Sequence, residues 1–125
     1  MSTNLPVLLV HPDRNTLAIM AAAVRESGHL ATVTDDFQEA TALLTTGVFA
    51  ALITAHVLGA HDGLHLILRA RAGRPAVAVV VTLPRPDPVV EAEATALGAV
   101  CVVEPWDDSA DLLEALSRVD HAVAV

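Results

Sequence analysis

Short apolar runs and helix-patterned segments alternate along the whole chain, and this alternation constrains its fold more than any other feature. The apolar runs cover residues 5–10, 30–34, 49–54, 76–81 and 100–103. Between them, apolar side chains recur at helical spacing, as in Leu17, Met20 and Val24. Five strands that alternate with five helices predict a parallel sheet covered by helices on both faces.

Helix-capping residues stand at several of the expected boundaries. Gly28 follows the first helical segment as a C-cap signal, and Asp36 with Glu39 three residues later resembles a capping box. Asp87 precedes a proline at the first position of another helix. A last helix is expected to begin after Asp107 or Asp108 and to direct the side chains of Leu112, Leu113, Leu116 and Val119 inward.

Right-handed crossovers then favour the doubly wound, flavodoxin-like topology with strand order 2-1-3-4-5. We therefore expect a three-layer α/β/α domain spanning residues 1–125, with a core at about 7–119 and a frayed tail at 120–125. Strands covered on both faces account for a mean hydropathy of +0.55 and for the 54% of residues that are hydrophobic.

Composition excludes several classes of function. The net charge of −8 and the absence of lysine argue against nucleic-acid binding by this domain. The longest apolar run, 76–81, is far shorter than the ~20 residues of a membrane helix, and the N-terminus has no signal-peptide pattern, so we expect a soluble, cytoplasmic protein. The single cysteine, Cys101, excludes an internal disulfide and a cysteine-based zinc site.

In such folds ligands bind at the carboxyl ends of the strands. The turn after the first strand, residues 11–15, has no glycine, which argues against a dinucleotide site, and no P-loop is present. His11, Asp13, His56, His61 and Glu104 would lie near this edge of the sheet. Their spacing is irregular, so we expect solvated loop residues and no metal site.

Four stretches, taken in order, resemble the receiver domains of bacterial response regulators, the CheY-like family. They are residues 8–13, residues 49–55 with Asp62-Gly63, residues 79–82, and Gly98-Ala99 with Glu104-Pro105-Trp106. The resemblance implies that an aspartate at the end of the third strand accepts a phosphoryl group. It also implies an acidic pair that holds Mg²⁺, a Ser/Thr on the fourth strand and a lysine on the fifth.

The chain departs from this pattern at nearly every functional position. Ala55 stands at the acceptor position, His11 and Pro12 at the acidic pair, and Glu104 at the lysine. Only Thr82 matches, and Asp13 is expected to be a helix cap. Loss of these groups removes carboxylate repulsion while the scaffold is kept. We therefore expect a degenerate phosphorylation pocket with no catalytic residues and with Mg²⁺ binding lost.

Within the resemblance, the face formed by the fourth helix, the fifth strand and the fifth helix often makes dimers. Candidate interface residues are Ala92, Ala96, Val100, Val102 and Trp106. Val102 also stands where family members often place an aromatic residue. Trp106 is either a packed turn residue or an exposed anchor for a partner.

Three functions follow from these observations. The first is a pseudo-receiver: a non-enzymatic module of bacterial two-component (phosphorelay) signalling that acts through protein partners or dimerisation. The second is a small-molecule or metal-binding flavodoxin-like domain that uses the strand-end pocket. The third is an ordinary phosphorylated receiver with another acceptor. The partner, the pathway and any attached output domain are not encoded in recognisable motifs.

Overall fold

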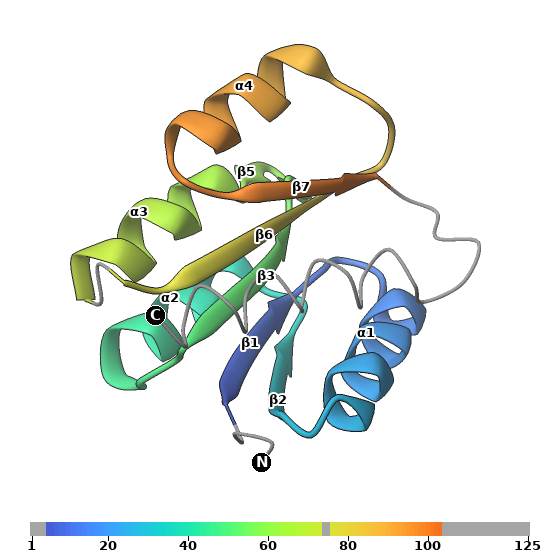
Figure 1. The fold of residues 1–125 in the computed structure, drawn as a ribbon, viewed down its shortest axis with the longest axis vertical. Coiled ribbons are helices and arrows are strands. Elements are labelled where there is room, and N and C mark those ends of the chain that lie inside the picture. The colour runs from blue at the N-terminus through green and yellow to red at the C-terminus, as the bar shows by residue number, and fades with distance from the viewer. Residues whose placement is uncertain (1–4, 74–75, 104–125) are drawn as a thin grey trace.

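The central sheet has five parallel strands in the order β2-β1-β3-β6-β7 (Figure 1). The computed structural model describes residues 5–73 and 76–103. The strands are β1 (Pro6–Val10), β2 (Leu30–Thr34), β3 (Ala51–Ala55), β6 (Ala78–Leu83) and β7 (Val100–Val103). Counted along the chain without the short hairpin described below, this is the predicted order 2-1-3-4-5 of the flavodoxin-like fold.

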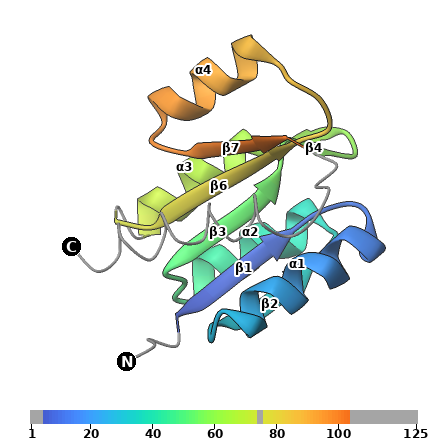
Figure 2. The same ribbon diagram turned by 45° about the vertical axis from the view of Figure 1, so that its right-hand side comes forward.

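Helices cover both faces of the sheet (Figures 1 and 2). They are α1 (Arg14–Glu26), α2 (Phe37–Thr46), α3 (Leu64–Gly73) and α4 (Pro88–Ala96). Alternate residues of each strand point to opposite faces, so the core divides into two clusters. Leu8 and Val10 of β1 pack with α2, α3 and α4, whereas Val7 and Leu9 pack with α1. This confirms the three-layer architecture.

The predicted caps are found at the ends of the helices. Side-chain oxygens of Asp13, Asp36 and Asp87 accept backbone hydrogen bonds at the N-termini of α1, α2 and α4. Gly28 and Gly98 follow α1 and α4 with φ of 88° and 83°, a left-handed conformation that favours glycine. Local sequence therefore defines where these helices begin and end.

Two predicted strands are displaced. The third strand was expected over 49–54 and the fourth over 76–81, but β3 and β6 begin two residues later and also end later. The ladder begins where Ala51 pairs with Ala78, and it continues to the pair Ala55 and Thr82. Strand pairing sets these limits, although Ala50 still donates its backbone N–H to Pro6 and accepts one from Ala78.

The segment expected as a plain loop after β3 contains a short antiparallel hairpin. Its strands are β4 (Val57–Leu58) and β5 (His61–Asp62), in which Val57 pairs with Asp62. Gly59 allows the turn because it adopts a φ of 63°. The hairpin places His56 and Asp62 on either side of its base.

Several expectations concern residues outside the described part of the chain. These are the last helix (107–119), the tail (120–125), Glu104 and Trp106. Within the described residues, no helix combines the length and the apolar character that a membrane span requires.

Candidate functional site

The site predicted at the carboxyl edge of the sheet is assembled by the parallel register. Val10 at the end of β1 pairs with Thr54 of β3, and Ala55 pairs with Thr82 of β6. His11 follows β1 directly, and its backbone N–H donates to the Thr34 carbonyl of β2 at 3.2 Å. The structure thus brings His11, Ala55 and Thr82 to one edge, as expected from the topology.

Ala55 occupies the position of the expected phosphoryl acceptor. Ala55 is only 4% exposed, and its methyl group belongs to the apolar cluster under α2, α3 and α4. A methyl group has no lone pair and no acidic proton, so it offers neither a nucleophile nor a metal ligand. The end of β3 therefore contributes packing and no chemistry.

Thr82 carries a hydroxyl group that is buried without a partner. The residue is 0% exposed, and Oγ1 makes no hydrogen bond in the described part of the structure. The neighbouring Thr54 is also fully buried, but its hydroxyl donates to the Ala55 carbonyl at 3.1 Å. A buried hydroxyl without a hydrogen-bond partner costs free energy. A ligand at the strand end could supply that partner, so the Thr82 hydroxyl is suited to contact one.

His11 is buried, which corrects the expectation of a solvated loop residue. It is 6% exposed, and its Nδ1 accepts a hydrogen bond from the Asp13 backbone N–H at 3.0 Å. In place of an acidic pair, the chain thus has a buried imidazole that organises its own turn. Pro12, beside it, is exposed.

Asp13 caps α1, as predicted. Its carboxylate accepts the Thr16 hydroxyl at 2.7 Å and the Asn15 backbone N–H at 3.2 Å. The Thr16 bond, the backbone N–H groups of the first turn and the nearby His11 lower the pKa of Asp13 below its usual value, and they outweigh the small opposing effect of desolvation. This carboxylate is exposed and is committed to the helix N-terminus.

A second group of polar residues lies beside β3 at the β4–β5 hairpin, where His56, expected near this edge, meets Asp62 in a pairing that was not predicted. His56 Nε2 lies 3.5 Å from Asp62 Oδ1, and the same oxygen accepts the backbone N–H of Leu64 at 2.8 Å. The His56 backbone N–H donates to the Thr82 carbonyl at 2.9 Å, which ties the hairpin to β6. The Asp-Gly pair before α3 was the available signal, but its histidine partner depends on the hairpin fold.

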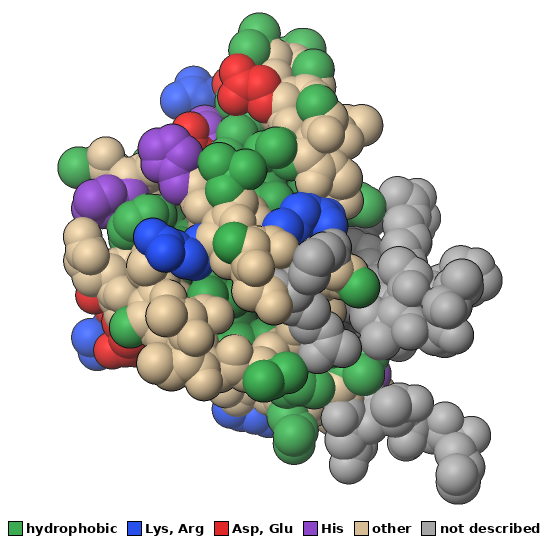
Figure 3. Space-filling model, turned by 90° about the vertical axis from the view of Figure 1, so that its left-hand side faces the viewer, with side chains coloured by type: hydrophobic (Ala, Val, Ile, Leu, Met, Phe, Trp, Pro, Cys, Tyr) green, Lys and Arg blue, Asp and Glu red, His purple; other side chains and the backbone are tan. Residues whose placement is uncertain are grey.

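Histidine side chains group at one edge of the surface in Figure 3, and among the described residues the exposed histidines are His61 and His65. The ring of His61 stacks on Phe37 with centroids 4.3 Å apart. Among residues 5–73 and 76–103, no three histidine, cysteine or acidic side chains are placed to hold a metal ion.

The candidate interface residues divide by exposure. Ala92 and Ala96 are exposed on α4, and Val100 is half-buried on β7. Val102 is 9% exposed and packs in the core with α1, so its assignment to an interface was wrong: its side chain points to the opposite face of the sheet. Glu104 and Trp106 lie outside the described residues.

Comparison with solved structures identifies the same fold. A receiver domain of an HD domain-containing protein from Pseudomonas fluorescens Pf-5 matches 98% of this chain and 100% of its own at 24% identity and a TM-score of 0.84. A CheY-like receiver from Methanospirillum hungatei JF-1 matches 96% of this chain and 97% of its own at 18% identity and a TM-score of 0.86. The beryllofluoride-activated NtrC4 receiver domain dimer matches 95% of this chain and 96% of its own at 18% identity and a TM-score of 0.82.

No protein-family model matches the chain, and no curated protein sequence matches it either. At identities below 25%, the structural likeness shows that the chain has the fold of CheY-like receiver domains. What these domains do can be carried over only as a proposal, because fold alone does not determine function.

Proposed function

We propose that this chain is a receiver-like signalling domain of a bacterial two-component (phosphorelay) system that is not phosphorylated at the usual position and acts by binding proteins. The observation that carries the proposal is the buried Ala55 at the end of β3, paired in register with Thr82. A receiver with this side chain keeps the frame of the phosphorylation site but lacks its nucleophile. The domain then has no enzymatic step to perform.

The loss of Mg²⁺ binding is part of the same proposal. Mg²⁺ takes oxygen ligands, usually carboxylates, in near-octahedral geometry. Here the acidic-pair positions hold the buried imidazole of His11 and Pro12, and the adjacent Asp13 is engaged by Thr16 and Asn15. Among the described residues, the two acidic-pair positions therefore offer no carboxylate to hold the ion.

A protein-binding role needs an exposed surface, and α4 offers one. Val89 is 67% exposed, and Ala92 and Ala96 are exposed on the same helix. We assign this surface to a partner protein or a second copy of the chain. The NtrC4 receiver domain, which has the same fold, forms a dimer, and this supports such a role.

Phosphorylation tests the proposal directly. The protein is incubated with acetyl phosphate and Mg²⁺, and its intact mass is then measured. We expect no adduct on this chain. A stoichiometric phosphoryl adduct, mapped to a single carboxylate, would refute the proposal and favour a receiver with another acceptor. A verified phosphorylated receiver treated in parallel shows that the reagent is active.

A second candidate, a small-molecule site at the strand ends, is favoured by the unpartnered hydroxyl of Thr82. Native mass spectrometry of the purified protein, with metal analysis of the same sample, separates the two functions. A retained stoichiometric ligand that is lost in Thr82→Val would support the binding site. An empty protein that still captures a partner protein through Val89 would support the interaction module.

A further inference from the structure

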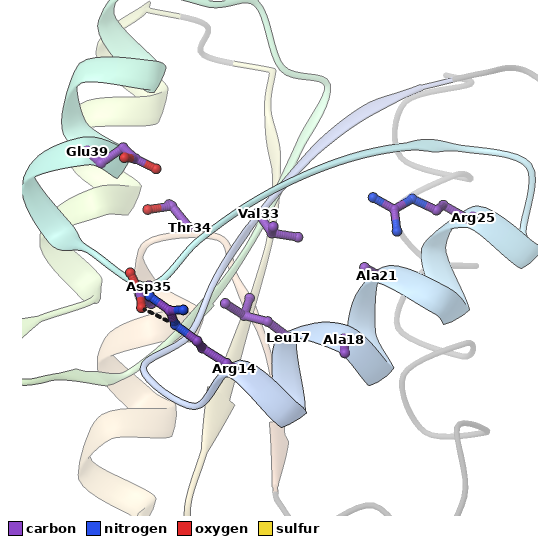
Figure 4. Close-up of a pocket in the computed structure, with 9 residues that line it drawn as sticks. All are labelled: Arg14, Leu17, Ala18, Ala21, Arg25, Val33, Thr34, Asp35 and Glu39. Atoms are coloured by element: carbon purple, nitrogen blue, oxygen red, sulfur yellow. Dashed lines mark hydrogen bonds and ion pairs between the residues drawn. The ribbon is translucent and has the colours of Figure 1, made fainter.

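An open groove of about 510 Å³ lies beside β2, on the side of the sheet covered by α1 (Figure 4). Its floor is apolar and is formed by Leu17, Ala21 and Val33. Arg14 and Arg25 stand at opposite ends of the groove on α1, and Glu39 reaches it from α2. The groove lies well away from Ala55 and Thr82, so it does not belong to the strand-end site.

The groove runs along the outer edge of the sheet. β2 is the terminal strand and pairs only with β1 among the described strands. Its sequence, Leu-Ala-Thr-Val-Thr, contains no charge, proline or glycine, which are the usual features that keep an edge strand from pairing. Leu30 and Val33 are 59% and 42% exposed. This edge therefore lacks the features that usually prevent another strand from pairing with it.

The hydrogen bonds between β2 and β1 determine which N–H and C=O groups of β2 remain available at the open edge. Leu30 donates its N–H to Leu5 and Thr34 accepts from His11, so both residues bond toward β1. Alternate residues of a strand direct their hydrogen-bonding groups to opposite sides. The N–H and C=O groups of Ala31 and Val33 consequently point to the open edge, and they can be satisfied there by a partner strand.

Charge is distributed in a complementary way along this edge. Arg14 already pairs with Asp35 at 3.1 Å, at the end of β2. Arg25, near the start of β2, and Glu39, beyond its end, have no ion-pair partner among the described residues, and both are exposed. The two unpaired charges therefore lie at opposite ends of the same strand (Figure 4).

We infer that β2 pairs antiparallel with β2 of a second copy of this chain, so that the two sheets join across a twofold axis and Arg25 of each copy faces Glu39 of the other. Antiparallel pairing is the arrangement that brings the start of one strand beside the end of its partner. It is also the arrangement that a closed, self-complementary dimer allows. This interface is separate from the α4 surface and goes beyond the proposed function.

The register follows from the outward-pointing groups. When Ala31 of each copy exchanges hydrogen bonds with Val33 of the other, Thr32 lies opposite its own counterpart on the axis. The two Thr32 residues then form a non-hydrogen-bonded pair, in which Cβ atoms lie about 4.5–5.5 Å apart. In the same register the two Leu30 side chains are about 13 Å apart along the strands.

Cysteine crosslinking tests this register. In a Cys101→Ser background, Thr32→Cys is oxidised mildly and analysed on a non-reducing gel, with Leu30→Cys as the matched control. We expect a dimer band for Thr32→Cys and none for Leu30→Cys, because a disulfide needs nearly adjacent Cβ atoms. Equal crosslinking of the two variants, or crosslinking of neither at high protein concentration, would overturn the inference.

A further variant keeps the test independent of oxidation. Val33→Pro removes an outward-pointing N–H and leaves the β1 ladder intact, as proline allows on an edge strand. Light scattering should show a dimer for the parent protein and a monomer for Val33→Pro, with an unchanged circular dichroism spectrum. A monomeric parent, or a dimeric Val33→Pro, would contradict the inference.

The ion pairs are tested by exchange of charge. Arg25→Glu should weaken the dimer about tenfold, since two symmetry-related pairs of modest strength are replaced by repulsion, and Arg25→Glu with Glu39→Arg should restore it. Arg69→Glu reverses an exposed charge on α3, outside both β2 and α4, and is the control that should leave this dimer unchanged. If Ala92→Glu abolishes the dimer and the β2 variants do not, the α4 surface is the interface and the inference about β2 is wrong.

Discussion

Gly63 lies so close to the carbonyl group of Ala55 that a Cβ atom on Gly63 would come 1.9 Å from that oxygen. The Gly63 N–H also donates to the His56 carbonyl at 2.7 Å. The chain therefore passes directly against the end of β3 before it enters α3. Glycine is needed at position 63 because any side chain would clash with this carbonyl group. The Asp-Gly pair identified in the sequence thus has two structural roles: Asp62 accepts the first N–H of α3, and Gly63 permits the close approach.

Replacing Gly63 by alanine should destabilise the fold by about 2 kcal/mol or more, because the backbone on both sides has to move. The measurement is urea denaturation followed by circular dichroism. Gly73→Ala is the matched control: its added Cβ would meet only the Leu44 carbonyl, at an ordinary 3.7 Å. That variant should change stability by less than about 1 kcal/mol, since alanine favours the end of α3. Similar losses for both would contradict this account of Gly63.

Thr54 and Thr82 provide a matched pair of buried hydroxyl groups. Thr54→Val should cost about 1 kcal/mol because it removes the hydrogen bond to the Ala55 carbonyl. Thr82→Val should be neutral or stabilising by up to about 1 kcal/mol, since Oγ1 of Thr82 has no partner to lose. Both free energies of unfolding are read from denaturant titrations under the same conditions. A larger loss for Thr82→Val would show that its hydroxyl is satisfied in solution.

Ala55→Asp places a carboxylate at the buried end of β3, where the proposed function assigns no acceptor. A carboxylate at this buried position should destabilise the protein by about 2 kcal/mol or more at neutral pH. Burial raises the pKa of the new carboxyl above its unfolded value of about 3.9, so the cost should grow as pH rises above that value and should shrink in acid. Stability is measured between neutral pH and about pH 4.

Ala55→Asn controls for the size of the new side chain without its charge. The difference in stability between the Asp and Asn variants should increase with pH. A difference that stays constant with pH would mean that the carboxyl at position 55 is not desolvated.

The parts of the fold that could be predicted are those encoded locally. Asp36 and Asp87 lie directly at helix starts, and their short side chains cap these helices wherever the helices pack. The alternation of Leu8 and Leu9 between the two core clusters follows from strand geometry. Repeated strand–helix alternation then leaves few topologies, which is why the strand order was predicted correctly.

The parts that were missed depend on pairing between segments. His11 looks like a loop residue in the sequence, but it is buried because its N–H bonds to Thr34 on the neighbouring strand. The two-residue strands around Gly59 are too short to show any periodicity. The side chain of Val102 points to the face of β7 that α1 covers, and this orientation depends on the register in which Val102 pairs with Thr82. That position 55 holds an alanine, in contrast, is visible from residue identity alone.

The pKa of Asp13 gives the stability of α1 a specific pH dependence. Hydrogen bonds from Thr16 and Asn15, together with His11, lower the pKa of the folded carboxyl below its usual 3.8. A lowered folded pKa means that the carboxylate stabilises the fold at pH values above the unfolded pKa, and that this contribution is lost as pH falls through the folded pKa. Asp13→Asn keeps a capping oxygen but removes the charge.

The difference in stability between the parent protein and Asp13→Asn should therefore be largest near neutral pH and should decline on acidification below about pH 4. An NMR titration measures the pKa of Asp13 directly, and in Thr16→Val it should rise toward 3.8 because the largest stabilising bond is removed. Circular dichroism of both variants confirms that α1 remains folded. If Asp13 titrates at 3.8 in the parent protein, or if Thr16→Val leaves its pKa unchanged, the Thr16 hydroxyl does not stabilise this charge.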